Sequence, residues 1–281
     1  MADARVVLIT GATGKQGGAV ARALAGQGFK IRAMTRKPSS EAARAIATTG
    51  AEVVAGDLDD PESLKKVLAG VWGVFGVQNT WEAGVEREEE QGKRLAELAR
   101  EAGVQHYVYS SVGSAHRRTG IPHFENKWRV EETVRSLAFP SHVIIRPVFF
   151  MENLTSPWFL NGDKLMAAMD PKTVLQMIAV EDIGKYGARA FVDAEKLTGR
   201  EIDLAGDAAT MPQTAEIFSH ALGRRIEFVR VPIEEVRKNS ADFGLMLEWF
   251  DRVGYNADIP GLEREFGINP TTLKEWAARQ R

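Results

Sequence analysis

The sequence predicts an α/β protein built on a doubly wound parallel sheet, with a smaller α/β lobe towards the C-terminal end. Two observations indicate this fold. Strand-like and helix-like segments alternate with short links through the first half of the 281 residues, which favours parallel strands joined by right-handed crossovers. The strand-like segments are continuous apolar runs, as expected where helices cover both faces of a sheet. Ligands of such sheets bind at the carboxyl ends of the strands, so functional residues are sought directly after each strand.

The first half is expected to contain six strands and five helices. The first strand, Val6–Ile9, is wholly apolar, and apolar residues at helical spacing then run through residues 15–27 until Gly28 can end the helix. A run of charge at residues 86–90 is interpreted as a solvated first helical turn, where negative charge suits the helix dipole. The other strands are expected at residues 30–34, 52–55, 74–77, 107–110 and 143–145, and the other helices at 41–48, 61–68, 86–102 and 124–135.

The second half alternates less regularly after Pro147. Residues 180–184 are typical of a strand end leading into a capped helix. An aromatic cluster forms either core or the lining of an apolar pocket, and a later amphipathic helix either covers the core or meets a partner. The cluster contains Phe149, Phe150, Trp158 and Phe159, and the helix carries Phe243, Leu247, Trp249 and Phe250. We expect one domain over residues 1–154 and a smaller lobe over 155–281, with part of 176–205 returning to the first sheet.

Charge and composition exclude several classes of protein. With 36 basic and 38 acidic residues the net charge is −2, so no global positive field attracts nucleic acid. The chain has no cysteine, which excludes disulfides and thiolate metal sites, and its five histidines show no paired metal-ligand spacing. No apolar run reaches the roughly 18 residues of a membrane span, and no signal-peptide pattern opens the sequence. We therefore expect a cytoplasmic protein that binds no metal.

A glycine-rich segment follows the first predicted strand and opens the first predicted helix. Gly11 allows a sharp turn, Gly14 lets a pyrophosphate approach the backbone, and Gly17 allows the helix to pack closely on the strand. The unpaired amides and the positive dipole end of the helix then face the phosphates. The alternative is a turn without a ligand. The segment predicts a Rossmann-type dinucleotide site formed by Gly11, Ala12, Thr13, Gly14, Lys15, Gln16 and Gly17.

The residues after the second strand indicate which dinucleotide binds. NAD sites usually place a carboxylate there, whereas this sequence has Arg36 and Lys37. A guanidinium can hold a 2′-phosphate in a bidentate fork. One charge-assisted hydrogen bond of about 1.5–3 kcal/mol favours NADP(H) by roughly 10- to 100-fold. The alternative is that both are ordinary surface cations.

Two further strand ends add candidate cofactor contacts. After the third strand come Asp57 and Leu58, and Asp57 is placed to accept a hydrogen bond from the adenine amino group or, alternatively, to cap the next helix. After the fourth strand come Gln78, Asn79 and Thr80, on the expected path of the pyrophosphate and the nicotinamide ribose.

Together these segments resemble the NmrA-like family of atypical short-chain dehydrogenases over nearly the whole chain. The motifs that carry the resemblance are Gly-Ala-Thr-Gly-Lys-Gln-Gly-Gly (11–18), Thr-Arg-Lys-Pro (35–38), Gly-Asp-Leu-Asp-Asp (56–60), Gln-Asn-Thr-Trp (78–81), Tyr-Ser-Ser (109–111), His-Phe-Glu-Asn-Lys (123–127), residues 146–154 and the closing helix at 269–276. The resemblance implies an NADP(H)-binding Rossmann domain and a smaller lobe that closes over the nicotinamide. It also implies that Lys127, Phe150 and Asn153 flank the nicotinamide end.

The same resemblance directs attention to a catalytic set. Reductases of the superfamily use Ser, Tyr and Lys, with Tyr and Lys four residues apart on one helix face. Here His123 occupies the tyrosine position, four residues before Lys127, and Ser110 ends the fifth strand. A neutral imidazole is a poor proton donor, so Lys127 is expected to hold the ribose and to deliver a proton. The alternatives are a surface salt bridge for Lys127 with Glu125 or Glu131, packing by Pro122 for His123, and local capping for Ser110.

Two functions remain open at this point. The first is an NADPH-dependent oxidoreductase that reduces a small carbonyl or quinone substrate, because the cofactor supplies the hydride and a quinone tolerates a weak acid site. The second is a non-catalytic NADP(H) redox sensor that acts through a regulatory protein partner. The sequence favours the first, with the oligomeric state left as monomer or homodimer.

Overall fold

The computed structural model describes residues 4–280, and the chain forms two compact units. The first unit comprises the residues up to Val112 together with Glu125–Arg146 and Ile183–Ile202. The second comprises Gly113–Phe124, Pro147–Asp182 and the residues from Asp203 onwards. Neither unit is therefore one continuous stretch of the chain.

The first unit is organised around a seven-stranded parallel sheet with the strand order β11-β6-β5-β4-β1-β2-β3. Register places Val7 of β1 between Ile31 of β2 and Gly73 of β4. The strand order reverses on the two sides of β1, and such a switch point is where ligands bind in doubly wound sheets. The strands are β1 (Val6–Ile9), β2 (Lys30–Thr35), β3 (Glu52–Ala55), β4 (Gly73–Gly76), β5 (His106–Ser110), β6 (Ser141–Pro147) and β11 (Glu201–Leu204).

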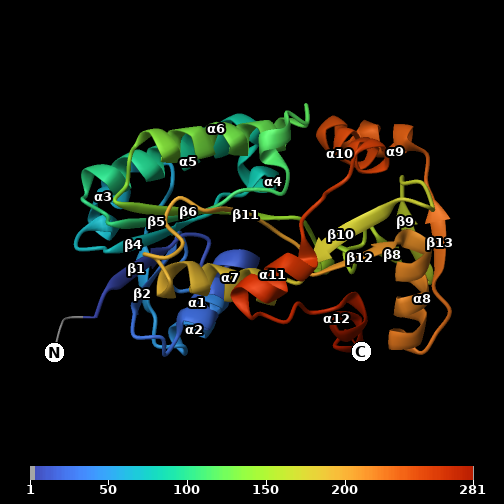
Figure 1. Cartoon of the computed structure of the whole chain (residues 1–281), viewed down its shortest axis with the longest axis horizontal. Coiled ribbons are helices and arrows are strands. Elements are labelled where there is room, and N and C mark those ends of the chain that lie inside the picture. The colour runs from blue at the N-terminus through green and yellow to red at the C-terminus, as the bar shows by residue number, and fades with distance from the viewer. Residues whose placement is uncertain (1–3, 281) are drawn as a thin grey trace. The chain divides into compact units, whose positions relative to one another are not determined.

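Helices cover both faces of this sheet, as Figure 1 shows: α3, α5 and α6 lie on one face, and α1, α2 and α7 on the other. Their bounds are α1 (Lys15–Leu24), α2 (Glu41–Ala47), α3 (Pro61–Leu68), α5 (Val85–Glu101), α6 (Pro122–Ser136) and α7 (Val180–Val192). A short helix, α4 (Thr80–Ala83), follows β4. The predicted doubly wound α/β fold is thereby confirmed, whereas α4 was not expected.

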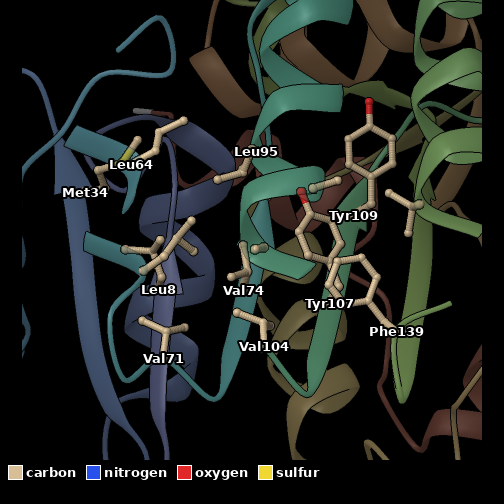
Figure 2. Close-up of a cluster of buried hydrophobic side chains, with 14 of the residues drawn as sticks. Leu8, Met34, Leu64, Val71, Val74, Leu95, Val104, Tyr107, Tyr109 and Phe139 are labelled. Atoms are coloured by element: carbon tan, nitrogen blue, oxygen red, sulfur yellow. The ribbon is translucent and has the colours of Figure 1, made fainter. Parts of the chain in front are cut away.

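A hydrophobic cluster between the sheet and α3, α5 and α6 holds the first unit together (Figure 2). Leu8 and Val74 point into it from neighbouring strands, and Leu64 and Leu95 meet them from α3 and α5. All four side chains are fully buried, and each such side chain contributes about 1.5–3 kcal/mol through its removal from water. This packing fixes the strand ends from which the candidate site residues follow.

The second unit contains two small sheets, ordered β12-β10-β7 and β13-β9-β8. Phe149 and Phe159 are buried there and pack edge to face, and Phe250 joins Phe149 from α10. Trp158, by contrast, is 72% exposed. The elements are η1 (Ala115–Arg117), β7 (Phe149–Phe150), η2 (Met151–Asn153), β8 (Leu160–Asn161), β9 (Lys164–Ala167), β10 (Val174–Ile178), β12 (Asp207–Thr210), α8 (Met211–Leu222), β13 (Glu227–Arg230), α9 (Ile233–Asn239), α10 (Ala241–Arg252), α11 (Ile259–Phe266) and α12 (Leu273–Ala278).

Two features are absent from residues 4–280. No helix there is both long and apolar enough to cross a membrane. The same residues hold no group of three or more His, Cys, Asp and Glu side chains arranged to bind a metal ion.

The stability of the fold is expected to depend on pH through one buried histidine, His106. His106 at the start of β5 is fully buried, its Nδ1 lies 2.8 Å from Ser141 Oγ, and its ring stacks on Trp72. Burial lowers the pKa of His106 from 6.5 to about 4. Because the unfolded chain takes up this proton at a higher pH than the folded protein, stability should fall as the pH drops from about 6.5 towards 4, with about 2 kcal/mol lost between pH 7 and pH 5.

We expect the difference in unfolding free energy between wild type and His106→Asn to become about 2 kcal/mol smaller as the pH falls from 7 to 5. Urea denaturation at a series of pH values measures it. The matched control is His220→Asn, which removes an exposed histidine and so measures the effect of losing a histidine outside the core. Parallel curves for wild type and His106→Asn would contradict the prediction.

Candidate functional site

The turn between β1 and α1 is fixed to the sheet by Thr10. The Thr10 hydroxyl donates to the Val77 carbonyl over 2.9 Å and accepts the Val77 amide over 2.8 Å. Thr10 is fully buried, so these two bonds join the carboxyl ends of β1 and β4. The chain then turns through Gly11, whose φ of +58° lies in the left-handed region that favours glycine. The backbone of the turn is therefore held in place before any ligand arrives.

Glycine is required to different degrees at the two later positions of the turn, Gly14 and Gly17. A Cβ at Gly17 would lie 2.4 Å from the Thr10 carbonyl oxygen, so folding itself requires glycine there. Gly14 is extended, with φ −99° and ψ −173°, a conformation that any residue adopts. A Cβ at Gly14 would meet only the Gly11 carbonyl oxygen, at 3.2 Å. A Cβ at that distance is closer than an ordinary contact and requires a shift of a few tenths of an ångström, a smaller demand than at Gly17. A close approach by a ligand is a second reason for a glycine at this position.

The start of α1 presents unpartnered amide groups. Gly14 is the N-cap residue, and within residues 4–280 no side chain caps the helix. The N–H groups in the first turn of a helix have no acceptors within that helix, so here they are open to a ligand. The first turn of α1 contains Lys15, Gln16 and Gly17, and no acidic residue lies there. Uncapped amides at the positive end of a helix dipole make an anion-binding site. Ala12 and Thr13 lie in the same turn, so the structure brings the whole predicted glycine segment to one place.

Arg36 follows β2 and is paired with a residue that the sequence analysis did not single out. Its Nη2 donates to Oε1 of Glu82 in α4, and both side chains are more than half exposed. Lys37 is exposed beside it, and its amide donates to Thr35 Oγ1 over 3.2 Å. The two predicted cations are thus at the carboxyl edge of the sheet, but the guanidinium already has a carboxylate partner.

The residues after β3 form a compact turn. Asp57 Oδ1 accepts the Asp59 amide over 3.0 Å, and the N-cap of α3 is Asp60 and not Asp57. The carbonyl of Leu58 accepts a hydrogen bond from Arg94 over 2.8 Å. The capping alternative for Asp57 is therefore wrong, and its second carboxylate oxygen is free of that turn bond.

The three predicted residues after β4 have three different surroundings. Asn79 caps α4 by accepting the Trp81 amide over 3.2 Å, and Thr80 donates its hydroxyl to Glu88. Gln78 is only 7% exposed, and neither polar atom of its amide has a hydrogen-bond partner within residues 4–280. A buried amide without partners costs about 1–3 kcal/mol. Gln78 therefore has hydrogen-bonding capacity left for a ligand.

Lys127 on α6 forms a buried ion pair. Its Nζ donates to Glu88 Oε1 over 2.6 Å, and the side chains of Lys127 and Glu88 are only 12% and 1% exposed. Glu88 Oε2 also accepts Asn126 Nδ2 over 2.8 Å and the Thr80 hydroxyl. Burial alone raises the pKa of Glu88, but the Lys127 charge and these hydrogen bonds outweigh it and hold the pKa below its ordinary value. Glu88 is therefore held as a carboxylate, and the ion pair holds both side chains in place.

This ion pair corrects two sequence interpretations. The charged run at 86–90 is not wholly solvated, because Glu88 faces inward from α5. Neither of the carboxylates expected for Lys127 is the partner found, and Glu131 instead binds Arg146 over 2.6 Å. Lys127 thus belongs to an interior network that links α5, α6 and the turn after β4.

Ser110 lies beside the glycine segment. It is fully buried at the end of β5, and its hydroxyl donates to Gln16 Oε1 of α1 over 2.7 Å. Local capping is therefore not its role. No tyrosine of β5 can replace the missing phenol, because Tyr107 and Tyr109 are fully buried in the core (Figure 2). Burial also raises the pKa of both phenols.

Three predicted residues belong to the second unit. His123, the second residue of α6, is 6% exposed, and its Nδ1 contacts Oδ1 of Asp242 on α10. It therefore does more than pack by Pro122. Phe150 ends β7, and Asn153 ends η2. The contact with Asp242 joins residues 119 positions apart, so no local pattern could have indicated it.

The sequence of this chain is similar to those of known proteins. A sequence model of the NmrA-like family matches residues 3–279. The chain belongs to the NmrA-like family. Among its relatives is an NmrA-like family domain-containing oxidoreductase, notA, of Aspergillus sp. (strain MF297-2), with 44% identity over 257 residues that cover 81% of this chain and 76% of the relative.

Two solved structures share the fold of this chain. NmrA, a negative transcriptional regulator in complex with NAD, superposes with a TM-score of 0.82 at 22% identity, over 98% of this chain and 95% of that one. The NADPH-dependent quinone oxidoreductase QOR2 of Escherichia coli, complexed with NADPH, gives 0.80 at 23% identity, over 98% and 99%. The α/β sheet of this chain, with its additional small sheets, therefore matches the fold of both solved structures.

Proposed function

We propose that this protein binds NADP(H) across the carboxyl ends of β1, β2 and β4. The observation that carries the proposal is the start of α1 at Gly14, where no side chain caps the helix and no Cβ covers the first turn. A pyrophosphate there accepts the first-turn amides of α1 without meeting a Cβ. The unsatisfied amide of Gln78 supports the same assignment, because a polar ligand would supply the partners that the protein does not.

We further propose that the protein is an NADPH-dependent oxidoreductase of a small carbonyl or quinone. NADPH, when bound, supplies the hydride. Lys127, which Glu88 holds in place, is proposed to hold the ribose hydroxyls and to donate a proton from Nζ to the substrate oxygen. Ser110 positions Gln16 through its 2.7 Å hydrogen bond. Phe150 and Asn153 are proposed to contact the nicotinamide end. The oxidoreductases among the relatives and fold neighbours support this function.

The test follows NADPH absorbance with purified protein and a panel of quinones and enones. Oxidation of NADPH that depends on one of these substrates is the expected result. Tight NADP(H) binding with no turnover across the whole panel would instead favour the second candidate, an NADP(H) sensor that acts on a protein partner. Two observations favour that candidate: a histidine stands at the tyrosine position, and a fold neighbour is a transcriptional regulator.

The choice between NADP(H) and NAD(H) can be tested separately at Arg36. Arg36→Ala should lower the affinity for NADP(H) about 10- to 100-fold while the affinity for NAD(H) stays within about twofold, because only NADP(H) carries the 2′-phosphate that the guanidinium binds. Isothermal titration calorimetry with both dinucleotides measures the ratio. Arg44→Ala, an exposed arginine on α2, is the matched control. An unchanged ratio in Arg36→Ala would remove this residue from the proposed site.

A further inference from the structure

One ion pair lies across the proposed cofactor site. Arg36 follows β2, Glu82 lies in α4 after β4, and β1 runs between those two strands. All three strands are parallel, so the pair spans the carboxyl end of β1, where the glycine turn begins. A dinucleotide that runs along this edge therefore meets a guanidinium whose nearest partner is already a carboxylate.

Other charges around the pair make the surroundings of Arg36 acidic. The hydrogen bond that Arg36 donates to Glu82 raises the pKa of Arg36, and the charges of Glu82, Asp57 and Asp59 act in the same direction. Asp59 is in turn bound by Arg87 over 2.6 Å. Asp59 is thus partly neutralised by its own arginine, whereas Glu82 is the carboxylate in contact with the Arg36 guanidinium.

We propose that Glu82 is a specificity-determining residue that competes with the 2′-phosphate of NADP(H) for Arg36 and so lowers the preference for NADP(H) over NAD(H). This inference rests on the proposed binding of a dinucleotide at the glycine turn. Arg36 remains the source of the preference for NADP(H), and Glu82 makes that preference smaller than it would be without the carboxylate that the phosphate displaces.

NADP(H) and NAD(H) would interact differently with Glu82. A phosphate monoester carries about −1.5 to −2 charges near neutral pH, so it repels the carboxylate that it displaces from Arg36. The ribose 2′-hydroxyl of NAD(H) is a hydrogen-bond donor that a carboxylate can accept. Because the Arg36–Glu82 pair is exposed, its own contribution to stability is small. The pair can therefore open when phosphate arrives, and Glu82 tunes the cofactor preference without blocking the site.

The test is Glu82→Gln, which removes the charge and keeps the size of the side chain. We expect the ratio of NADP(H) to NAD(H) affinity, measured by calorimetry at low salt, to rise about five- to tenfold. The increase should come from NADP(H), and it should shrink at high ionic strength, since exposed charges are screened. The matched control is Glu86→Gln, which removes the same charge from an exposed residue of the neighbouring helix.

The outcomes separate this inference from the proposed function. Wild-type protein that binds neither dinucleotide contradicts the proposed function itself. Wild-type protein that binds, with a ratio in Glu82→Gln within about twofold of the wild-type value, overturns only the role of Glu82. An equal rise in Glu86→Gln also overturns it, because the effect would then come from net charge and not from the contact with Arg36.

Discussion

Gly14→Ala should lower the affinity for NADP(H) at least about 100-fold while the free energy of unfolding stays within about 1 kcal/mol of wild type. The extended backbone of Gly14 is open to any residue, and its added Cβ would lie 3.2 Å from the Gly11 carbonyl oxygen, which requires a shift of a few tenths of an ångström. The same methyl group would stand where the pyrophosphate approaches the first turn of α1. Hydrogen bonds to charged groups contribute about 1.5–3 kcal/mol each, so the loss of two of them accounts for this effect.

Gly17→Ala is the matched comparison, because the same atom is added three residues later. Its Cβ would lie 2.4 Å from the Thr10 carbonyl oxygen, and backbone atoms cannot yield cheaply at that distance. We expect a loss of about 1–3 kcal/mol in the free energy of unfolding or failure to fold. Calorimetry for binding and urea denaturation for stability separate the two variants. Gly14→Ala that binds NADP(H) like wild type would show that no ligand approaches this residue.

Lys127→Ala should lower kcat/KM for the best quinone or enone by about 100-fold or more, the usual size of a lost general acid. It should also reduce the free energy of unfolding by about 3–5 kcal/mol, because Glu88 would remain buried without its counter-charge. Stopped-flow and steady-state assays with NADPH measure the first effect, and urea denaturation measures the second.

Lys127→Arg separates these two effects. Arginine keeps a positive charge for Glu88, so most of the stability should return, but its planar donor group cannot occupy the position of Nζ. Turnover should therefore stay about tenfold or more below wild type, the size expected of a misplaced proton donor. Full turnover by folded Lys127→Ala or Lys127→Arg would exclude proton donation from Nζ and leave Lys127 as the counter-ion of Glu88.

Much of the first unit could be predicted because its signals are local. Val6–Ile9 is apolar on both faces, and the periodic segment after it ends at glycines, so strand and helix follow from short windows of sequence. The carboxyl ends of parallel strands share one edge, so Arg36 and Asp57 could be placed near the glycine turn without a structure. The helix α4 was missed because its four residues are too few to show a period.

The charged contacts could not be predicted, because their partners are distant in the sequence. Glu88 lies in a run that is typical of a solvated helix, and only the fold shows that Lys127, 39 residues later, meets it in the interior. Glu82 lies 46 residues from Arg36. A buried carboxylate and an exposed one look alike in sequence, since the difference depends on which side of the helix faces the sheet.

Binding of NADP(H) at the glycine turn is the claim on which the proposed reaction, the roles of Arg36 and Glu82 and the effect of Gly14→Ala all depend. Isothermal titration calorimetry of the wild-type protein with NADP⁺ and with NADPH tests it most directly. We predict saturable binding of at least one of them at micromolar concentrations, with one dinucleotide per chain. No heat of binding from either form at millimolar concentrations would contradict it.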